Sequence, residues 1–155
     1  MEHVHVEPFK IIGLSVRTSD KFGKAVVDVG ITWLHFEFMK LYYDIPNKTS
    51  ANMHVVYTDH EPKYMGEFTA IIGCAVSSID EVPKGMVGVE VQGGDFTKYS
   101  VHGRATEVVP AKWKEIWKKD EETFKMHGTD FEIYNNGYPL NLGKVDVDIY
   151  IADNK

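Results

Sequence analysis

The sequence contains one cysteine among its 155 residues. Cys74 lies in the apolar run 70–76, so no disulfide forms within one chain and a buried, unreactive thiol is expected. No stretch approaches the roughly 20 apolar residues that a transmembrane helix requires. The acidic N-terminal segment alternates polar and apolar residues, which is not the pattern of a secretory signal peptide. We therefore expect a cytoplasmic protein that does not enter the membrane.

Basic residues are in the minority. The chain carries 17 lysines and arginines against 23 aspartates and glutamates, for a formal net charge of -6. Because nucleic acids are bound through a basic face, we expect no direct nucleic-acid binding. The acidic balance is compatible with a cationic small ligand, although most acidic proteins use their surface charge only for solubility.

Sequence motifs of common catalytic and cofactor sites are absent as well. There is no Gly-x-Ser-x-Gly, no Walker loop and no dinucleotide fingerprint. The histidines are scattered, and the sequence contains neither a His-Glu-x-x-His nor a Cys-x-x-Cys zinc-binding motif. We predict no metal site and no cofactor.

The chain does contain an ordered series of strand and helix patterns. Strand-like runs are those around 4–17, 53–58, 68–76, 86–91, 96–102, 131–134 and 145–151. Helical periodicity extends from Phe22 to about Tyr43, and again from Val109 to about Asp120 with Pro110 in the first turn. The second helix is expected to fray near 125–128. The order strand, helix, strand, strand thus occurs twice.

Two antiparallel strands for each helix indicate an α+β fold. We predict two β-α-β-β repeats, about 1–79 and 80–155, related by a pseudo-two-fold axis within a single domain 1–155. Each repeat is too small to stand alone. The repeats are therefore expected to form one antiparallel sheet with both helices on one side.

The first helix carries two neighbouring apolar stripes. One comprises Phe22, Val26, Val29, Trp33 and Phe36, and the other Val27, Ile31, Leu34, Phe38 and Leu41. A helix that is apolar over so wide an arc is normally buried on more than one side. We expect one stripe to cover the sheet and the other to enter a groove between the repeats.

The strand 131–134 places a carboxylate near tyrosines. If Ile133 faces the helices, Glu132 and Tyr134 face the other way, and Tyr150 of the last strand joins them there. A carboxylate beside tyrosine rings is a suitable receptor for a flat organic cation. The alternative is that these are ordinary residues on a solvated sheet face. Trp113 and Trp117, four residues apart, are expected in the core.

Taken together, these segments resemble the GyrI-like small-molecule-binding domains, which also form the effector-binding halves of AraC-type and MerR-type multidrug regulators. The resemblance rests on the segments 6–15, 94–103, 113–117, 131–134 and 147–151. The stand-alone form is similar to cationic drug-binding proteins of mobile gene cassettes. Because no helix-turn-helix segment is present in the 155 residues, the regulator function is not carried over.

The resemblance implies that Glu132 lies in the pocket and meets cationic ligands. We accordingly expect a ligand site between the repeats, lined by Trp33, Tyr57, Glu132, Tyr134 and Tyr150. Its function would be reversible binding of hydrophobic, often cationic, aromatic molecules. The family usually carries Leu-Trp within its first helix, whereas Trp precedes Leu here, so the helical side chain that enters the pocket is left open. A homodimer is compatible with the sequence.

Two other functions fit the same residues. The relatives include a hydrolase subgroup acting on cyclopropane-bearing toxins, in which case Glu132 would be a general base assisted by a tyrosine hydroxyl. They also include gyrase-inhibitor-like proteins, which would make the chain a protein-interaction module. A second proton-transfer group near Glu132 would favour the hydrolase, and an exposed patch away from the pocket would favour the interaction module.

Overall fold

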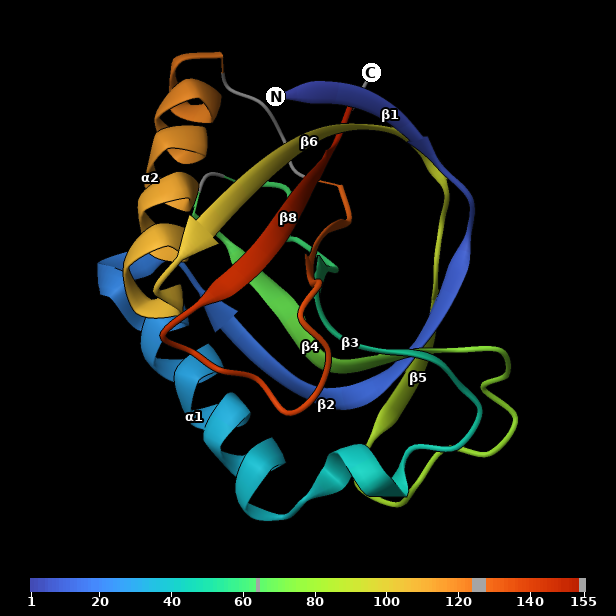
Figure 1. The fold of residues 1–155 in the computed structure, drawn as a ribbon. Coiled ribbons are helices and arrows are strands. Elements are labelled where there is room, and N and C mark those ends of the chain that lie inside the picture. The colour runs from blue at the N-terminus through green and yellow to red at the C-terminus, as the bar shows by residue number, and fades with distance from the viewer. Residues whose placement is uncertain (64, 124–127, 154–155) are drawn as a thin grey trace.

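The computed structural model describes residues 1–63, 65–123 and 128–153 (Figure 1). The described strands are β1 (Glu2–Val6), β2 (Phe9–Ser19), β3 (Lys48–Thr58), β4 (Glu67–Val76), β5 (Val87–Val91), β6 (Gly94–Gly103), β7 (Asp130–Tyr134) and β8 (Val145–Ala152). The α-helices are α1 (Lys24–Phe38) and α2 (Ala105–Thr123), and short 3-10 turns cover Lys21–Gly23 and Leu41–Asp44. None of the described helices combines the length and apolar character needed to span a membrane.

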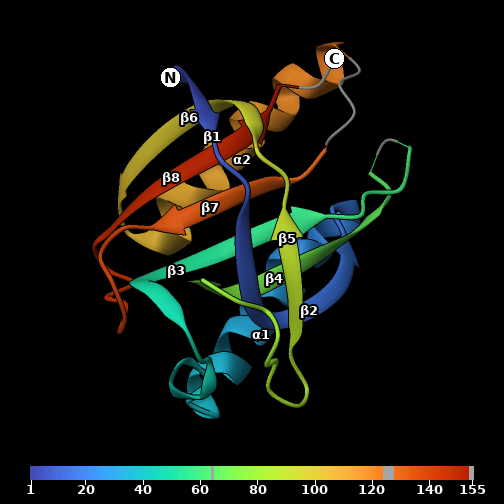
Figure 2. The same ribbon diagram turned by 90° about the vertical axis from the view of Figure 1, so that its right-hand side faces the viewer.

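All strands belong to one antiparallel sheet, in the order β1-β6-β8-β7-β3-β4-β2-β5. The order is symmetric about the contact between β7 and β3, with the units β2-α1-β3-β4 and β6-α2-β7-β8 on either side. Both helices lie on the outer side of a strongly curled sheet, and β1 and β5 lie on the side away from them (Figures 1 and 2). The predicted α+β fold with two helices on one side is confirmed.

The first strand was expected to be continuous but is divided in two at Glu7 and Pro8. Proline has no N–H to donate to a strand ladder, which interrupts the pairing. The register nevertheless continues across the break, since Val6 pairs with Gly94 and Phe9 pairs with Val91. Only glycine fits at position 93, because a Cβ atom there would lie 2.4 Å from the Val6 carbonyl oxygen. The two bent strands β1-β2 and β5-β6 therefore pair along their length and draw the sheet into a curl.

The curl produces two apolar cores, one on each face of the sheet. The outer core, beneath the helices, includes Phe36, Val55, Ile72, Trp113, Val147 and Ile149. The inner core, inside the curl, includes Ile11, Val56, Ile71, Val91, Phe96 and Phe131. Apolar side chains on both faces mean that an apolar residue in a strand does not by itself identify the helix side.

Both helices differ from their predicted limits. α1 ends at Phe38, five residues early, and Lys40 after it adopts the left-handed conformation at φ 54°. α2 begins at Ala105, ahead of Pro110, and the Ala105 N–H donates to the Leu142 carbonyl at 2.8 Å. The predicted fraying of this helix near 125–128 falls almost entirely outside the described residues.

Only one face of α1 is buried, and the prediction that both would be is wrong. Ala25, Thr32 and Phe36 lie against the sheet. The second stripe remains in solvent, where Val27, Ile31, Leu34 and Phe38 are 58–84% exposed. The physical reason is the single helical layer: only the sheet and the cavity toward α2 are available to cover the helix.

Candidate functional site

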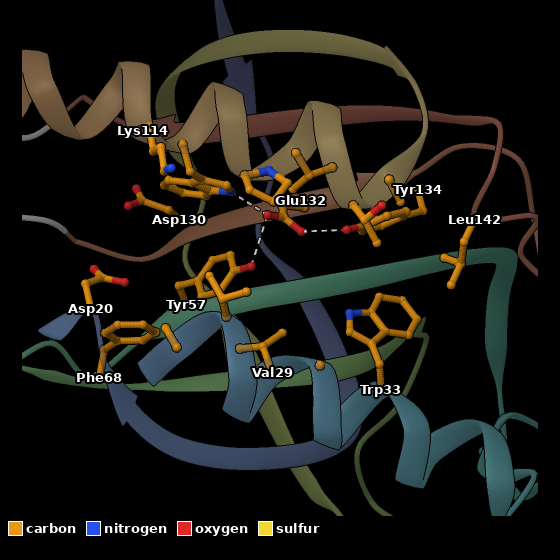
Figure 3. Close-up of a pocket in the computed structure, with 18 of the residues that line it drawn as sticks. Asp20, Val29, Trp33, Tyr57, Phe68, Lys114, Asp130, Glu132, Tyr134 and Leu142 are labelled. Carbon is orange, nitrogen blue, oxygen red and sulfur yellow. Dashed lines mark hydrogen bonds between the residues drawn. The ribbon is translucent and has the colours of Figure 1, made fainter. Parts of the chain in front are cut away.

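A cavity of about 420 Å³ opens between α1 and α2, above the central strands β3 and β7 (Figure 3). Its size lies within the range of small-molecule pockets. The lining is mostly aromatic and aliphatic, and it includes Val29, Trp33, Tyr57, Phe68, Val109, Trp113, Trp117, Tyr134, Leu140 and Leu142. The first helix, the second helix and the two middle strands each contribute one wall.

Glu132 lies at the middle of this cavity with only 1% of its surface exposed. It is the third residue of β7 and pairs with Val55 of β3 and Ile149 of β8. Residues paired across a sheet point to the same face, and Ile149 belongs to the core beneath the helices. The carboxylate is thereby directed toward α1 and α2.

The prediction that Ile133 faces the helices was wrong. The error also removes Tyr150 from the face that carries Glu132. Ile133 faces the inside of the curl, so Glu132 and Tyr134 occupy the helix side in its place. Tyr150 pairs with Phe131 on the inner face and stacks on its ring at 4.5 Å. Tyr150 therefore does not share a pocket with Glu132. The error came from treating the inner face as solvated, although it carries a core of its own.

Three neutral donors hold the Glu132 carboxylate in place (Figure 3). The Trp113 indole N–H donates to Oε2 at 2.5 Å, and the Tyr57 hydroxyl donates to the same oxygen at 3.0 Å. The Tyr134 hydroxyl donates to Oε1 at 3.1 Å. These bonds satisfy the carboxylate without neutralising its charge, since no basic side chain in the described part of the chain forms an ion pair with it.

Burial dominates the electrostatics of the group. Removal from water raises the pKa of Glu132, and the hydrogen bonds from Trp113, Tyr57 and Tyr134 oppose that rise only in part. Burial also raises the pKa of both tyrosines well above the ordinary value, with the neighbouring carboxylate adding to the effect. The hydroxyls therefore stay protonated and act as donors. The site is a polar centre in which the buried Glu132 carboxylate forms no ion pair with a basic side chain of the described residues.

Further carboxylates surround the same cavity. Asp20, Glu37 and Asp130 line it together with Glu132, whereas Lys114 is the lysine among the described lining residues. Asp20, Asp130 and Lys114 lie toward one end, and Trp33 and Leu142 lie toward the other (Figure 3). The described lining thus carries more acidic than basic side chains.

Of the two α1 side chains considered for the pocket, Trp33 is the one that packs against its aromatic wall. Trp33 is partly buried and meets the Tyr134 ring edge-on at 5.4 Å, whereas Leu34 is 70% exposed at the mouth. Opposite, Trp113 meets the Tyr57 ring edge-on at 5.3 Å. The structure thus brings together four of the five predicted residues: Trp33, Tyr57, Glu132 and Tyr134.

The two tryptophans of α2 line the cavity, although the sequence predicted them in the core. Trp113 and Trp117 were expected in the core, yet both line the cavity, and Trp113 also bonds to the buried carboxylate. Trp113 is part of the core cluster as well, so its periodicity alone could not reveal the second role. Their i, i+4 spacing placed them on one helix face.

Replacement of Trp33 distinguishes two roles for this side chain, contact with the ligand and packing in the core. We expect Trp33→Leu to weaken binding of a planar aromatic cation by about 10-fold, since a ring face contributes ~1–2 kcal/mol to a desolvated cation. The melting temperature should change little, because Trp33 is only partly buried. The measurements are titration calorimetry and thermal denaturation. A destabilised variant with unchanged affinity would place Trp33 in the core instead.

The residues described offer no cluster of three or more histidine, cysteine or acidic side chains suited to a metal ion. Cys74 is buried beside the Met53 sulfur at 3.9 Å, and burial raises the pKa of its thiol to about 12. A thiol with so high a pKa is a poor nucleophile at neutral pH.

A curled antiparallel sheet with two helices that enclose an aromatic pocket around a buried glutamate defines an effector-binding domain. The chain belongs to the family of integron-associated effector-binding proteins, Cass2, whose family model matches residues 3–152. This confirms the predicted family relationship, and it gives binding of a small-molecule effector as the general function. No curated protein matches the sequence.

Solved structures show the same fold across nearly the whole chain. The integron cassette protein VCH_CASS2 from Vibrio cholerae matches with a TM-score of 0.72 and 22% identity, over 97% of this chain and 95% of that one. SAV2435, solved with tetraphenylphosphonium bound, matches with a TM-score of 0.76 and 12% identity, over 97% and 91%. A transcription-regulation protein from Staphylococcus aureus MU50 matches with a TM-score of 0.72 and 13% identity, over 97% and 95%.

Proposed function

We propose that this protein binds hydrophobic aromatic cations reversibly in the cavity between α1 and α2, with Glu132 as the charge complement. The observation that carries the proposal is the buried Glu132 carboxylate, whose hydrogen-bond donors among the described residues are all neutral. A buried charge without a counter-ion is costly to a folded protein. A cationic ligand supplies that counter-ion, and the ligand's apolar surface replaces water along the aromatic walls.

Three further features support a cation over a neutral ligand. The lining carries the additional carboxylates Asp20, Glu37 and Asp130. The aromatic rings of the walls attract positive charge through their faces. SAV2435, which shares the fold, was solved with a lipophilic cation. Trp33, Tyr57 and Tyr134 would contact the aromatic part of the ligand.

The direct test is thermal denaturation with a matched pair of compounds, tetraphenylphosphonium and the uncharged triphenylphosphine oxide. A ligand at about 100 times its dissociation constant raises the unfolding free energy by roughly 2.7 kcal/mol. We expect the cation to raise the melting temperature by several degrees and the neutral compound to have a much smaller effect. Equal shifts of the melting temperature with both compounds would contradict the proposed charge selectivity. They would show that the cavity binds apolar molecules regardless of charge.

Hydrolysis is the second candidate, and one observation favours it. The Tyr57 and Tyr134 hydroxyls lie within hydrogen-bonding distance of Glu132, which is the arrangement required of a general base with an assisting acid. The raised pKa of Glu132 suits a base near neutral pH, but the raised pKa values of the tyrosines make them weak acids. Incubation with a cyclopropane-bearing electrophile, followed by mass spectrometry for the hydrated product, tests this function. Turnover that Glu132→Gln abolishes would favour an enzyme.

A further inference from the structure

A second cavity, of about 320 Å³, lies inside the curl of the sheet, and we call it the inner cavity. The described residues that line it come from β1, β2, β3, β4, β7 and β8 and from Asn135 after β7, and none comes from a described helix (Figure 2). It shares no described residue with the cavity between α1 and α2. The inner cavity is therefore a separate site, of a size that suits a small molecule.

The alternation of side chains along β3 and β7 places the two cavities on opposite faces of the same strands. Glu132 points toward the helices, so its neighbours Phe131 and Ile133 point into the curl. His54 pairs with Ile133 and therefore lies on the same inner face. Tyr150, whose ring stacks on that of Phe131 at 4.5 Å, adds a further wall. The register of the strands thus brings a histidine and aromatic rings together inside the curl.

Several apolar side chains of the inner cavity are only partly covered by the protein. Val6, Phe9, Ile133 and Tyr150 line the cavity and are half-buried, although each packs against the inner core. The Phe9 ring meets the Phe131 ring edge-on at 5.0 Å. Aromatic rings pack favourably against one another edge-on or offset-stacked. A flat aromatic ligand would therefore remove the remaining apolar surface of these walls from water.

His54 supplies a hydrogen-bond acceptor in the wall of the inner cavity. The residue is only 5% exposed, and burial lowers the pKa of its imidazole to about 4, so the ring is neutral at neutral pH. Its Nδ1 lies 3.2 Å from the Asn52 carbonyl oxygen, which can only accept, so the single ring proton is on Nδ1. Nε2, at the far corner of the ring, then carries a lone pair. No described residue forms a hydrogen bond with Nε2, and a ligand that donates a proton would satisfy it.

The charge of the lining distinguishes the inner cavity from the cavity between α1 and α2. No aspartate, glutamate, lysine or arginine is among the described residues that line the inner cavity. Its polar rim is formed where β3 leaves regular pairing with β4 between Lys48 and Met53, and it includes Thr49, Ser50 and Asn52. A charged ligand would lose its hydration here without meeting an opposite charge. The lining therefore favours a neutral ligand.

We propose that the inner cavity binds a neutral aromatic molecule that carries a hydroxyl group, such as a phenol or a naphthol. The ligand hydroxyl donates to Nε2 of His54, and the ligand ring packs against Phe9, Phe131 and Tyr150. An ether of the same shape has no proton to donate and leaves the Nε2 lone pair unsatisfied. This site is independent of cation binding between α1 and α2, because the two cavities share no described residue.

Titration calorimetry of the whole chain with 2-naphthol and 2-methoxynaphthalene tests the role of the hydroxyl. We expect the wild type to bind 2-naphthol about 10-fold more tightly, the effect of about one net hydrogen bond. His54→Phe keeps an aromatic ring but removes the acceptor, so it should abolish this preference. His35→Phe, the same change at an exposed position of α1, is the matched control and should retain it. Equal affinities of the wild type for the two compounds, or a preference that persists in folded His54→Phe, would overturn the proposal.

NMR spectra of the wild type locate the bound compound without relying on a variant. All three tryptophans of the chain line the cavity between α1 and α2, and none lines the inner cavity. Adding 2-naphthol should shift the His54 Nε2 signal and the ring signals of Phe131, and should leave the three indole N–H signals in place. Shifted indole signals with an unchanged His54 signal would place the compound in the other cavity and overturn the proposal. Absence of binding up to about 1 mM would overturn it as well.

Discussion

Glu132→Gln should abolish most of the affinity for tetraphenylphosphonium while leaving that for triphenylphosphine oxide nearly unchanged. Removing one partner of a buried charge pair typically costs 2–5 kcal/mol, so we expect a loss of about 100-fold or more for the cation. Glutamine has almost the same shape and keeps an oxygen that can accept from Trp113 and Tyr57. The Tyr134 hydroxyl can rotate to accept from the new amide. Titration calorimetry with both compounds provides the comparison.

The stability of the variant serves as the control. Because burial raises the pKa of Glu132, the ionised carboxylate costs the folded protein free energy at neutral pH. Glu132→Gln removes that cost, so its melting temperature in the absence of ligand should equal or exceed that of the wild type. Loss of binding in a variant of undiminished stability cannot be ascribed to unfolding. Equal losses for cation and neutral compound would show that the carboxylate shapes the pocket and does not select charge.

The affinity for a cation should fall as the pH is lowered through the raised pKa of Glu132. Below that pKa the carboxylate is protonated, and the affinity should decrease by up to about 10-fold for each further pH unit. Above it, the affinity should reach a plateau. Triphenylphosphine oxide should show no such dependence. Binding isotherms of both compounds between about pH 4 and pH 9 test this.

The direction of the Glu132 pKa shift can be tested by measuring the unfolding free energies of the wild type and Glu132→Gln as a function of pH. A carboxyl group whose folded pKa is raised stabilises the fold fully below its unfolded pKa, and that contribution is lost as the pH rises through the folded value. His54 acts in the opposite sense, because burial lowers its pKa to about 4 and its contribution is lost in acid. The Glu132 contribution is therefore the difference between wild type and Glu132→Gln. A difference that does not shrink toward acid pH would contradict the raised pKa.

Much of the fold followed from local patterns in the sequence. The alternation of Val145, Val147 and Ile149 predicted β8, because each of these side chains meets the same core. The interruption at Pro8 was missed, since the apolar alternation continues on both sides of it. The first half of β3, 48–52, was missed because its polar side chains give no pattern. Lys48 pairs with Val76 of β4, the register then shifts before Met53, and the Thr49 hydroxyl within this irregular stretch donates to the Ala75 carbonyl.

The site was only partly accessible from the sequence. Glu132 was singled out by its place beside tyrosines in a predicted strand and by family resemblance, whereas the direction of its side chain depended on which face of the sheet the helices cover. That choice is made by the curl, which places Phe131 and Tyr150 in a second core. The Trp113 hydrogen bond joins α2 to β7 in three dimensions. No linear spacing encodes it.

The curl of the sheet also determines when β1 can form its hydrogen bonds during synthesis. β1 pairs with β6, and Glu2 has its partner at Lys98. During synthesis, β1 therefore has no strand neighbour until the segment that carries β6 has followed it. Contacts between such distant segments carry a loop-closure cost and slow folding. β1 is thus made well before it can acquire its hydrogen bonds in the sheet.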